Sequence, residues 1–348
     1  MDERVILGIL AILIGVGVGF VLFVPFVAIS YRRRGGLGFW RFAGWAAFLV
    51  YFFAIWTYTL LPLPDPDAIA CVGAILDPRS VVDDVIAGLQ SGNPLRSPQL
   101  LQIAFNVLLF IPLGFFLRVL LGRGLIVTVL TGLGVSLLIE VTQLTGVWGL
   151  YPCAYRFFDV GDLMTNTTGA LIGGVLSLVI PRRHWGAGRA VDAGAPRPVT
   201  KPRRVLAMLC DAIAVMISSA AAGIGTQLWL EYIAEDHAAV VDGTAAQAAS
   251  TAAPLVVLAA VILTTGRSVG DLTVELRYAG GPVPEPFFRV LRYVTGIGGY
   301  LLLALLPAPW SALAFAFAAV IVITTLATER GRGLPGLLTG RRLVDARD

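Results

Sequence analysis

Polar side chains gather at the ends of three neighbouring apolar segments of this sequence. The set that could do chemistry comprises Asn106, Glu140, Gln143, Asp159, Asp162 and Asn166. Carboxylate and amide oxygens suit hard cations such as Mg²⁺ or Ca²⁺, and they also hydrogen-bond sugar hydroxyls or a cationic headgroup. Two carboxyl groups could instead act as a general acid and base. A zinc site or a catalytic triad is not expected, because His184 and His237 are the only histidines and lie in other segments.

Helical spacing predicts that these polar groups share faces with small residues. Glu140 and Gln143 are three residues apart and therefore lie on one helix face. Asp162, Asn166 and Gly169 follow one another at steps of four and three and also form one stripe. Small residues let membrane helices approach closely, so we expect the polar groups to point into the bundle rather than into lipid.

A carboxylate inside a membrane helix is costly unless it is paired or hydrated, which makes Glu140 the strongest candidate for function. Arg156 is the only arginine close by on the same side, and it could pair with Glu140 or with Asp159. The alternative is a structural network of hydrogen bonds that locks three helices together. Asp159 could also serve only as a cap for the helix that follows it.

The elements that position these groups are membrane-spanning helices. Of the 348 residues, 57% are hydrophobic and 14% are charged. Many windows of about 20 residues carry almost no charge, and that length crosses a hydrocarbon core about 30 Å thick. Unbroken apolar runs favour helices over the alternating strands of a membrane barrel. We predict an all-α polytopic bundle of about nine spans, near residues 5–29, 40–61, 102–121, 125–145, 163–181, 205–230, 251–266, 290–306 and 310–327.

Basic residues predict a multi-pass cell-membrane protein with its N-terminus outside and its C-terminus in the cytoplasm. The triplet Arg32, Arg33 and Arg34 follows the first span, and such residues are enriched on the cytoplasmic side. Alternation from there puts all but four of the 26 Lys and Arg residues inside. This positive charge would contact anionic lipid, and nucleic-acid binding is not expected.

The cysteines allow one disulfide. Cys71 and Cys153 both fall in outer loops under this orientation, where oxidising conditions permit a bond. Two unpaired thiols are the alternative.

Residues 182–203 break the hydrophobic pattern with Arg, Pro, Gly and Ala, which predicts a flexible cytoplasmic linker. The linker separates a five-span module, residues 1–181, from a four-span module, residues 204–348, which ends in a cytoplasmic tail.

The first module resembles the VanZ family. The motifs that carry the resemblance are "FNVLLFIPLGFFL", "IEVTQ" and "RFFDVGDLMTNTTGALIGG", which follow in order within about residues 40–181. They hold the asparagine, Glu-x-x-Gln and Asp-x-x-Asp-x-x-x-Asn positions named above. The family is associated with resistance to the glycopeptide teicoplanin and with changes of the cell envelope, so the resemblance implies an envelope role without naming a reaction.

The second module resembles the RDD family. "RRVLAMLCDAIAV" carries Arg204 and Asp211 of that family's entry motif, and "FFRVLRY" carries its later arginine, Arg289. The resemblance implies a transport or accessory role, in which Asp211 pairs with Arg204 two turns away or with Arg289. A structural charge pair is the alternative. Asp271 stands where the family has a lysine, and Gly336 replaces the closing aspartate, which weakens an ion-transport role.

We therefore expect an envelope protein that binds an amphiphile in an outward polar pocket. The partners would be membrane lipids, a lipid-linked precursor or a lipoglycopeptide antibiotic. Whether the protein is an enzyme stays open: a membrane enzyme acting on a lipid-linked substrate is the first alternative, and an ion or solute transporter is the second. No catalytic residue, metal ligand set or certain cofactor is assigned, and Mg²⁺ or Ca²⁺ at the carboxylates is the ion binding that the residues would allow.

Overall fold

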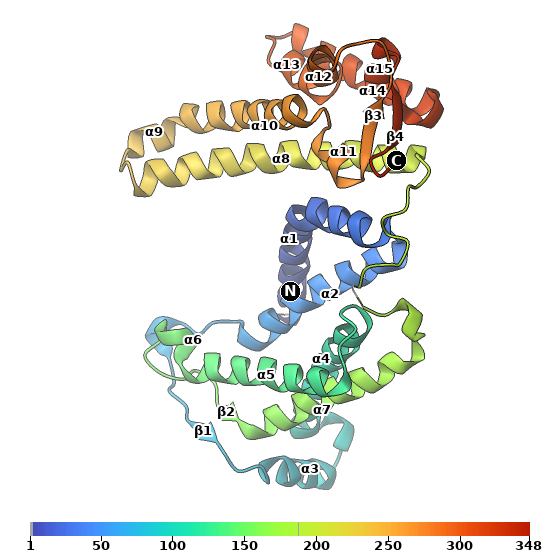
Figure 1. Ribbon diagram of the computed structural model, residues 1–348. Coiled ribbons are helices and arrows are strands. Elements are labelled where there is room, and N and C mark those ends of the chain that lie inside the picture. Colours follow the sequence, from blue (N-terminus) through green and yellow to red (C-terminus); the bar gives the residue numbers. More distant parts are fainter. Residues whose placement is uncertain (1–2, 187) are drawn as a thin grey trace. The chain divides into compact units, whose positions relative to one another are not determined.

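The computed structural model describes residues 3–186 and 188–348, which fold almost entirely into helices (Figure 1). Seven helices are long and apolar enough to cross a membrane. They are α1 (Glu3–Arg34), α2 (Phe39–Leu60), α4 (Pro98–Val119), α5 (Leu125–Leu144), α8 (Lys201–Tyr232), α10 (Thr244–Thr265) and α14 (Leu313–Ala327). The predicted all-α polytopic class is therefore confirmed.

The structure has fewer spans of full length than the predicted nine. α12 (Glu285–Val294) and α13 (Ile297–Ala304) count as an eighth span only when taken together, because they meet at a bend of 48°. The predicted span at 163–181 corresponds to α7 (Val160–Leu176), which has 17 residues and continues as the short 3-10 helix η3 (Ser177–Val179).

Short elements connect these helices. The remaining α-helices are α3 (Ser80–Gln90), α6 (Gly146–Gly149), α9 (His237–Asp242), α11 (Val269–Thr273) and α15 (Gly333–Thr339). The other 3-10 helices are η1 (Pro66–Ala68), η2 (Pro94–Arg96), η4 (Arg182–His184), η5 (Trp310–Ala312) and η6 (Glu329–Gly331). The strands are β1 (Ala74–Ile75), parallel to β2 (Phe158–Asp159), and β3 (Leu276–Ala279), antiparallel to β4 (Arg342–Asp345).

The described chain forms two compact units. The first comprises the residues up to Gly19 together with Gly38–Gly188, and the second comprises Phe20–Leu37 together with Arg189–Asp348. In the most apolar 18-residue window of each of the seven long helices, only between 11% and 33% of the residues are buried. Most of their hydrocarbon surface therefore faces outward, as lipid contact requires.

Glycines bring α4 and α7 of the first unit into backbone contact. A Cβ built on Gly114 of α4 would collide with the carbonyl oxygen of Ala170, and one built on Gly173 of α7 would collide with that of Ile111. Small residues permit this approach in membrane bundles. The fully buried ring of Phe110 lies in the same region, in a core with side chains of α2 and α5.

Tyr51 of α2 reaches into the hydrogen-bond ladder of α4. Its hydroxyl donates to the carbonyl of Leu109 at 2.6 Å and accepts from the amide of Leu113 at 3.1 Å. These are two groups that an α-helix joins directly. Because Pro112, just before Leu113, supplies no amide hydrogen, α4 is already weakened there, and Tyr51 ties it to α2.

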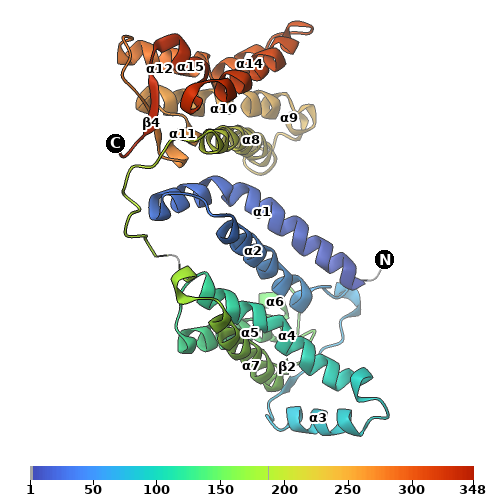
Figure 2. The ribbon, with the colours of Figure 1, turned by 90° about the vertical axis from the view of Figure 1, so that its right-hand side faces the viewer.

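In the second unit, α8 and α10 lie side by side (Figures 1 and 2). A core of apolar side chains from the end of α1, α8, β3, α12 and β4 lies at one end of this pair: Val27, Cys210, Leu276, Phe288 and Leu343. Arg203, which is 6% exposed, donates to the carbonyls of Val274 and Glu275 and to the carboxylate of Asp345 at 2.8 Å.

Candidate functional site

A pocket of about 590 Å³ lies between α2, α4, α5 and α7 of the first unit. It brings together six of the seven residues that the sequence placed in one polar site: Asn106, Glu140, Gln143, Arg156, Asp162 and Asn166. Hydrocarbon side chains form the rest of the lining, among them Leu61, Phe105, Leu109 and Ile139. This Glu140 pocket, defined by these ten residues, is thus lined by both polar and apolar side chains.

Glu140 of α5 is almost fully buried, with 2% of its surface exposed. Its carboxylate accepts a hydrogen bond of 2.9 Å from the backbone amide of Asp159. Within the described residues, Glu140 forms no ion pair with Arg156. A buried carboxylate with one donor still has lone pairs to satisfy, so the site favours a ligand that brings further donors or positive charge.

Asp159 acts as a cap. Its carboxylate accepts from the amide of Gly161 at 2.7 Å at the start of α7, and its side chain does not line the Glu140 pocket. Capping satisfies an amide at the helix start that has no partner within the helix. The same residue therefore starts α7 with its side chain and holds Glu140 with its backbone.

Asn106 and Asp162 join α4 to α7 across the pocket. The amide nitrogen of Asn106 donates to Asp162 at 2.6 Å. This bond turns both side chains toward the same space, which also contains Glu140. Two carboxyl groups and one guanidinium group line the pocket, so its polar side is acidic.

Asn166 presents an unpartnered polar atom. It is 4% exposed, and its Nδ2 donates to the hydroxyl of Ser136 at 2.9 Å. Its Oδ1 has no hydrogen-bond partner among the described residues. If the amide oxygen and nitrogen of Asn166 were exchanged, its nitrogen rather than its oxygen would have no partner, since a serine hydroxyl can donate or accept. One amide atom of Asn166 is therefore left for a ligand or an ordered water.

Gln143 and Arg156 donate hydrogen bonds to a carbonyl in the last turn of α2. Gln143 Nε2 donates to the carbonyl of Thr59 at 2.8 Å, and Arg156 donates to the same oxygen at 3.1 Å. Tyr155 donates to the neighbouring carbonyl of Leu60 at 3.2 Å, and burial raises the pKa of Tyr155, so this hydroxyl stays protonated. Terminal helix carbonyls need such donors, and a cation is favourable there. Thr59 and Tyr155 were not singled out from the sequence, because long-range hydrogen bonding leaves no local pattern.

Cys71 and Cys153 are joined by a disulfide, with their Cα atoms 5.6 Å apart. The backbone amide of Val72 donates to the carbonyl of Ala154 at 3.0 Å, and β1 pairs with β2 just beyond. The bond therefore fixes the loop before α3 to the segment that delivers Arg156 and Asp159. Cys210 is a free thiol buried in the second unit.

The described residues contain no group of three or more His, Cys, Asp or Glu side chains placed to hold a metal ion. Glu140 and Asp162 are the two acids of the pocket. Binding of Mg²⁺ or Ca²⁺ there would need oxygens from amides, water or the ligand itself.

The three polar residues predicted for the second module do not meet one another. Arg204 pairs with Asp271 of α11, and Asp211 accepts from the amide of Gly270 at 2.7 Å. Arg204 and Asp211 are separated by about 10 Å along one helix, which is too far for a direct pair. Arg289 bonds to carbonyls of Leu263 and Thr264 at the end of α10.

Asp271 is the acid at the centre of this cluster. It is fully buried and lies between Arg204 and Arg292, the latter at 2.8 Å. Burial alone would raise the pKa of Asp271, but the two guanidinium groups outweigh it and hold that pKa well below its usual range. Arg292 lies three residues after Arg289 on α12, so helical spacing allowed either to be the buried arginine.

Residues 48–181 match the model of the VanZ/LLP1 family. That range contains all seven residues predicted for the outer pocket, and it ends before α8. No curated protein and no solved structure matches the chain. The similarity to the RDD family stays a prediction.

Proposed function

We propose that the VanZ/LLP1-like range, residues 48–181, binds an amphiphile at the outer face of the cell membrane. The observation that carries the proposal is the Glu140 pocket of about 590 Å³, whose lining combines the buried Glu140, the half-buried Asp162 and the unpartnered amide atom of Asn166 with hydrocarbon side chains. Ligand sites commonly combine an apolar lining with a few convergent polar groups. A lipid, a lipid-linked precursor or a lipoglycopeptide has the matching shape, with a polar head and a hydrocarbon tail.

The polar side of the pocket favours a headgroup that donates hydrogen bonds. Glu140 and Asp162 offer carboxylate oxygens, whereas the one guanidinium group of the lining, on Arg156, bonds to the end of α2. Hydroxyl, amide or ammonium groups would supply the donors that the acids lack. A bare phosphate would instead face two like charges.

The outward position of the pocket rests on the arginine-rich end of α1 and on the disulfide. Arg32, Arg33 and Arg34 form the last turn of α1, as expected of a cytoplasmic end. A Cys71–Cys153 bond is expected to persist in an oxidising compartment, and Cys153 lies three residues before Arg156 of the pocket lining. A protein that binds envelope amphiphiles here could lower susceptibility to a teicoplanin-type glycopeptide.

The test compares Glu140→Gln and Asp162→Asn with the control Asp83→Asn, which changes an exposed acid of α3. Each purified variant is analysed by native mass spectrometry in mild detergent, and cells with equal expression are assayed for glycopeptide susceptibility and lipid composition. We expect wild type and control to retain a co-purifying amphiphile and the pocket variants to lose it. Equal retention and equal susceptibility in all four proteins would refute the proposal.

The same preparation separates binding from catalysis. Extracted envelope lipids are incubated with the protein, with and without Mg²⁺ or Ca²⁺, and with a chelator. Binding without any new product supports the amphiphile-binding role. A product that requires the metal and Glu140 would favour the enzyme alternative, in which a carboxyl group acts as general base.

A further inference from the structure

A second cavity, in the second unit, is lined mainly by arginine. It has a volume of about 630 Å³ and is lined by Arg32, Arg33, Arg189, Ala193, Gly194, Glu275 and Arg347. Four guanidinium groups therefore face one carboxylate in the lining. This arginine pocket, defined by those seven residues, is distinct from the Glu140 pocket, and nothing in the amphiphile proposal uses it.

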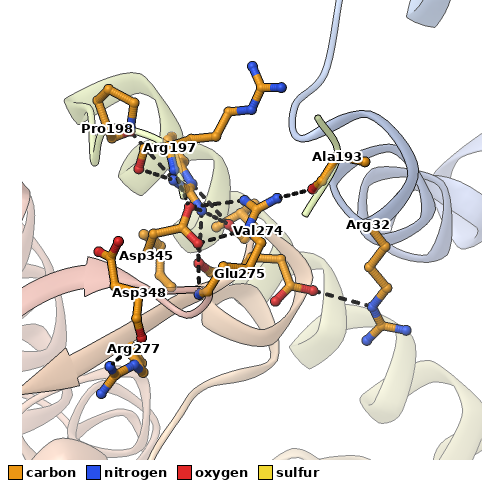
Figure 3. Close-up of polar contacts among 12 residues, drawn as sticks. Arg32, Ala193, Arg197, Pro198, Val274, Glu275, Arg277, Asp345 and Asp348 are labelled. Carbon is orange, nitrogen blue, oxygen red and sulfur yellow. Dashed lines mark hydrogen bonds and ion pairs between the residues drawn. The ribbon is translucent and has the colours of Figure 1, made fainter. Parts of the chain in front are cut away.

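Three segments that are distant in sequence are fixed around the arginine pocket. The amide of Ala190 donates to the carbonyl of Arg33 at 2.8 Å, which attaches the segment after residue 188 to the end of α1. Arg347 donates to the carbonyl of Ala193 at 2.8 Å, and the amide of Arg197 donates to Asp345 at 3.1 Å. Figure 3 shows this network around Asp345. The predicted flexible linker is thus held in place where it lines the pocket.

The single acid of the lining is already engaged. Glu275 pairs with Arg32 at 3.5 Å, as Figure 3 shows, and with Arg267 at 3.9 Å. Its backbone has a φ of 55°, a left-handed conformation that a residue with a side chain rarely adopts. Such backbone strain is found where the surrounding structure over-determines a residue, commonly at ligand sites.

The lining contains four arginines and one acid, so its formal charge is positive. Arg347 is paired with Asp345 at 2.8 Å, and Arg32 shares Glu275. Arg189 has no hydrogen bond or ion pair with any residue in the described ranges, and its guanidinium lies beside Gly194. Guanidinium groups are planar donors that match the oxygens of a phosphate in pairs.

We propose that the arginine pocket binds a phosphate-bearing anion. Arg189, on the segment after residue 188, and Arg33, at the end of α1, both line this pocket. One phosphate bound there could accept hydrogen bonds from Arg189 and from a neighbouring arginine of the lining. Two sources offer this chemistry: the headgroup of an anionic phospholipid and a free phosphate. Basic pockets beside membrane helices on the cytoplasmic side are suited to anionic lipid headgroups, and the arginine-rich end of α1 is predicted to lie there.

The test measures ligand-induced shifts of the unfolding temperature of the full chain in detergent. The probes are a short-chain phosphatidylglycerol, a short-chain phosphatidylcholine and inorganic phosphate. The pocket variants are Arg189→Gln and the double variant Arg33→Gln/Arg189→Gln. The matched control is Arg330→Gln/Arg342→Gln, which removes two exposed arginines of the same unit outside the pocket.

A ligand that binds only the folded state raises the unfolding temperature, and the shift grows with the logarithm of the ligand concentration divided by its dissociation constant. We expect phosphatidylglycerol to stabilise wild type and control. The double variant removes two guanidinium groups and should need at least about tenfold more of it, because the loss of even one charge-assisted contact is worth about that factor. An equal response to inorganic phosphate would identify a free phosphate as the ligand.

Three outcomes would overturn the proposal: no shift with either phosphate source, an equal shift with phosphatidylcholine, or an equal loss in the control variant. Folding of each variant is checked without ligand by the reactivity of the buried thiol Cys210, which stays unreactive only while the second unit is folded.

Discussion

Asn106 donates a hydrogen bond of 2.6 Å to Asp162, although the two residues are 56 positions apart in the chain. Asn106→Ala removes this donor and leaves the Asp162 carboxylate with fewer partners. We expect a loss of about 1–2 kcal/mol in the free energy of unfolding. The measurement is a double-mutant cycle with Asp162→Asn. If Asn106→Ala lowers the free energy of unfolding by the same amount in the Asp162→Asn background as in wild type, the two side chains are not coupled.

Gly173 should not tolerate a methyl group. A Cβ there collides with the carbonyl of Ile111 on α4, and backbone cannot move aside as a side chain can. Gly173→Ala is expected to destabilise the first unit by about 1–3 kcal/mol, as overpacking does. The control is Gly134→Ala on α5, where no atom lies within 4 Å of the new Cβ. It should be neutral or slightly stabilising, and equal losses would contradict close contact of α4 with α7.

Asp271 should matter far more for stability than Arg289. Asp271→Asn leaves the buried guanidinium groups of Arg204 and Arg292 without their carboxylate, a loss expected to cost about 3–5 kcal/mol. Arg289→Gln removes bonds at a more exposed site and should cost about 1 kcal/mol or less. Thermal unfolding of both variants in detergent measures the difference. A larger effect of Arg289→Gln would favour the sequence-based pairing of Asp211 with Arg289.

Acid should destabilise the second unit through Asp345 as well as Asp271. Burial raises the pKa of Asp345, but hydrogen bonds from Arg347 and Arg203 outweigh it and lower that pKa below its usual range. An unfolded aspartate takes up its proton near pH 3.9, whereas the folded one does so at lower pH. The stabilisation is therefore complete above about pH 4 and is lost as the pH falls toward the folded pKa.

Near-ultraviolet circular dichroism during denaturation at stepwise lower pH measures this loss. Asp345→Asn should be less stable than wild type at pH 7 and should lose less further stability below about pH 4. An unchanged pH dependence in this variant would show that Asp345 titrates alike in both states.

The disulfide should stabilise the first unit. The bond joins residues 82 positions apart, and removal of such a link by Cys71→Ser should cost about 2–4 kcal/mol. Thermal unfolding with and without reductant measures the cost in wild type. The variant Cys71→Ser should be insensitive to reductant, and equal stability of oxidised and reduced wild type would contradict the prediction.

The same cysteines test the orientation of the chain. After mild reduction of intact cells, a membrane-impermeant thiol reagent should label Cys71 and Cys153 and should spare the buried Cys210. Labelling that appears only after the membrane is opened would place these loops in the cytoplasm and would reverse the proposed topology.

Helices were predictable because their cause is local. Apolar runs of about 20 residues must satisfy their own backbone in lipid, and α4, α5 and α8 lie where such runs occur. The bend between α12 and α13 was missed, since Gly296 interrupts an apolar run without making it polar. Hydropathy averages over that single position.

The polar residues that line the Glu140 pocket could be predicted from their expected depth and helix face, but the hydrogen bonds among them could not. Glu140, Asn106 and Asp162 share a depth that counting along the helices reveals. Arg156 was expected to pair with Glu140 or with Asp159; it lines the same pocket as Glu140 but donates to the carbonyl of Thr59, 97 positions away. Arg204 similarly forms an ion pair with Asp271 rather than with Asp211. Such partners depend on how whole helices pack together, and the spacing of residues within one helix does not determine that packing.

The buried ion pair between Arg203 and Asp345 has a consequence for biosynthesis. Its guanidinium is synthesised 142 positions before its carboxylate partner Asp345. During that interval α10 and α14, which are long and apolar enough to cross a membrane, are synthesised. The charge at the start of α8 is expected to stay near water meanwhile, because an unpaired buried cation is costly. Strand β4 is translated after these helices, so the pair of Arg203 with Asp345 can form only once they have been made.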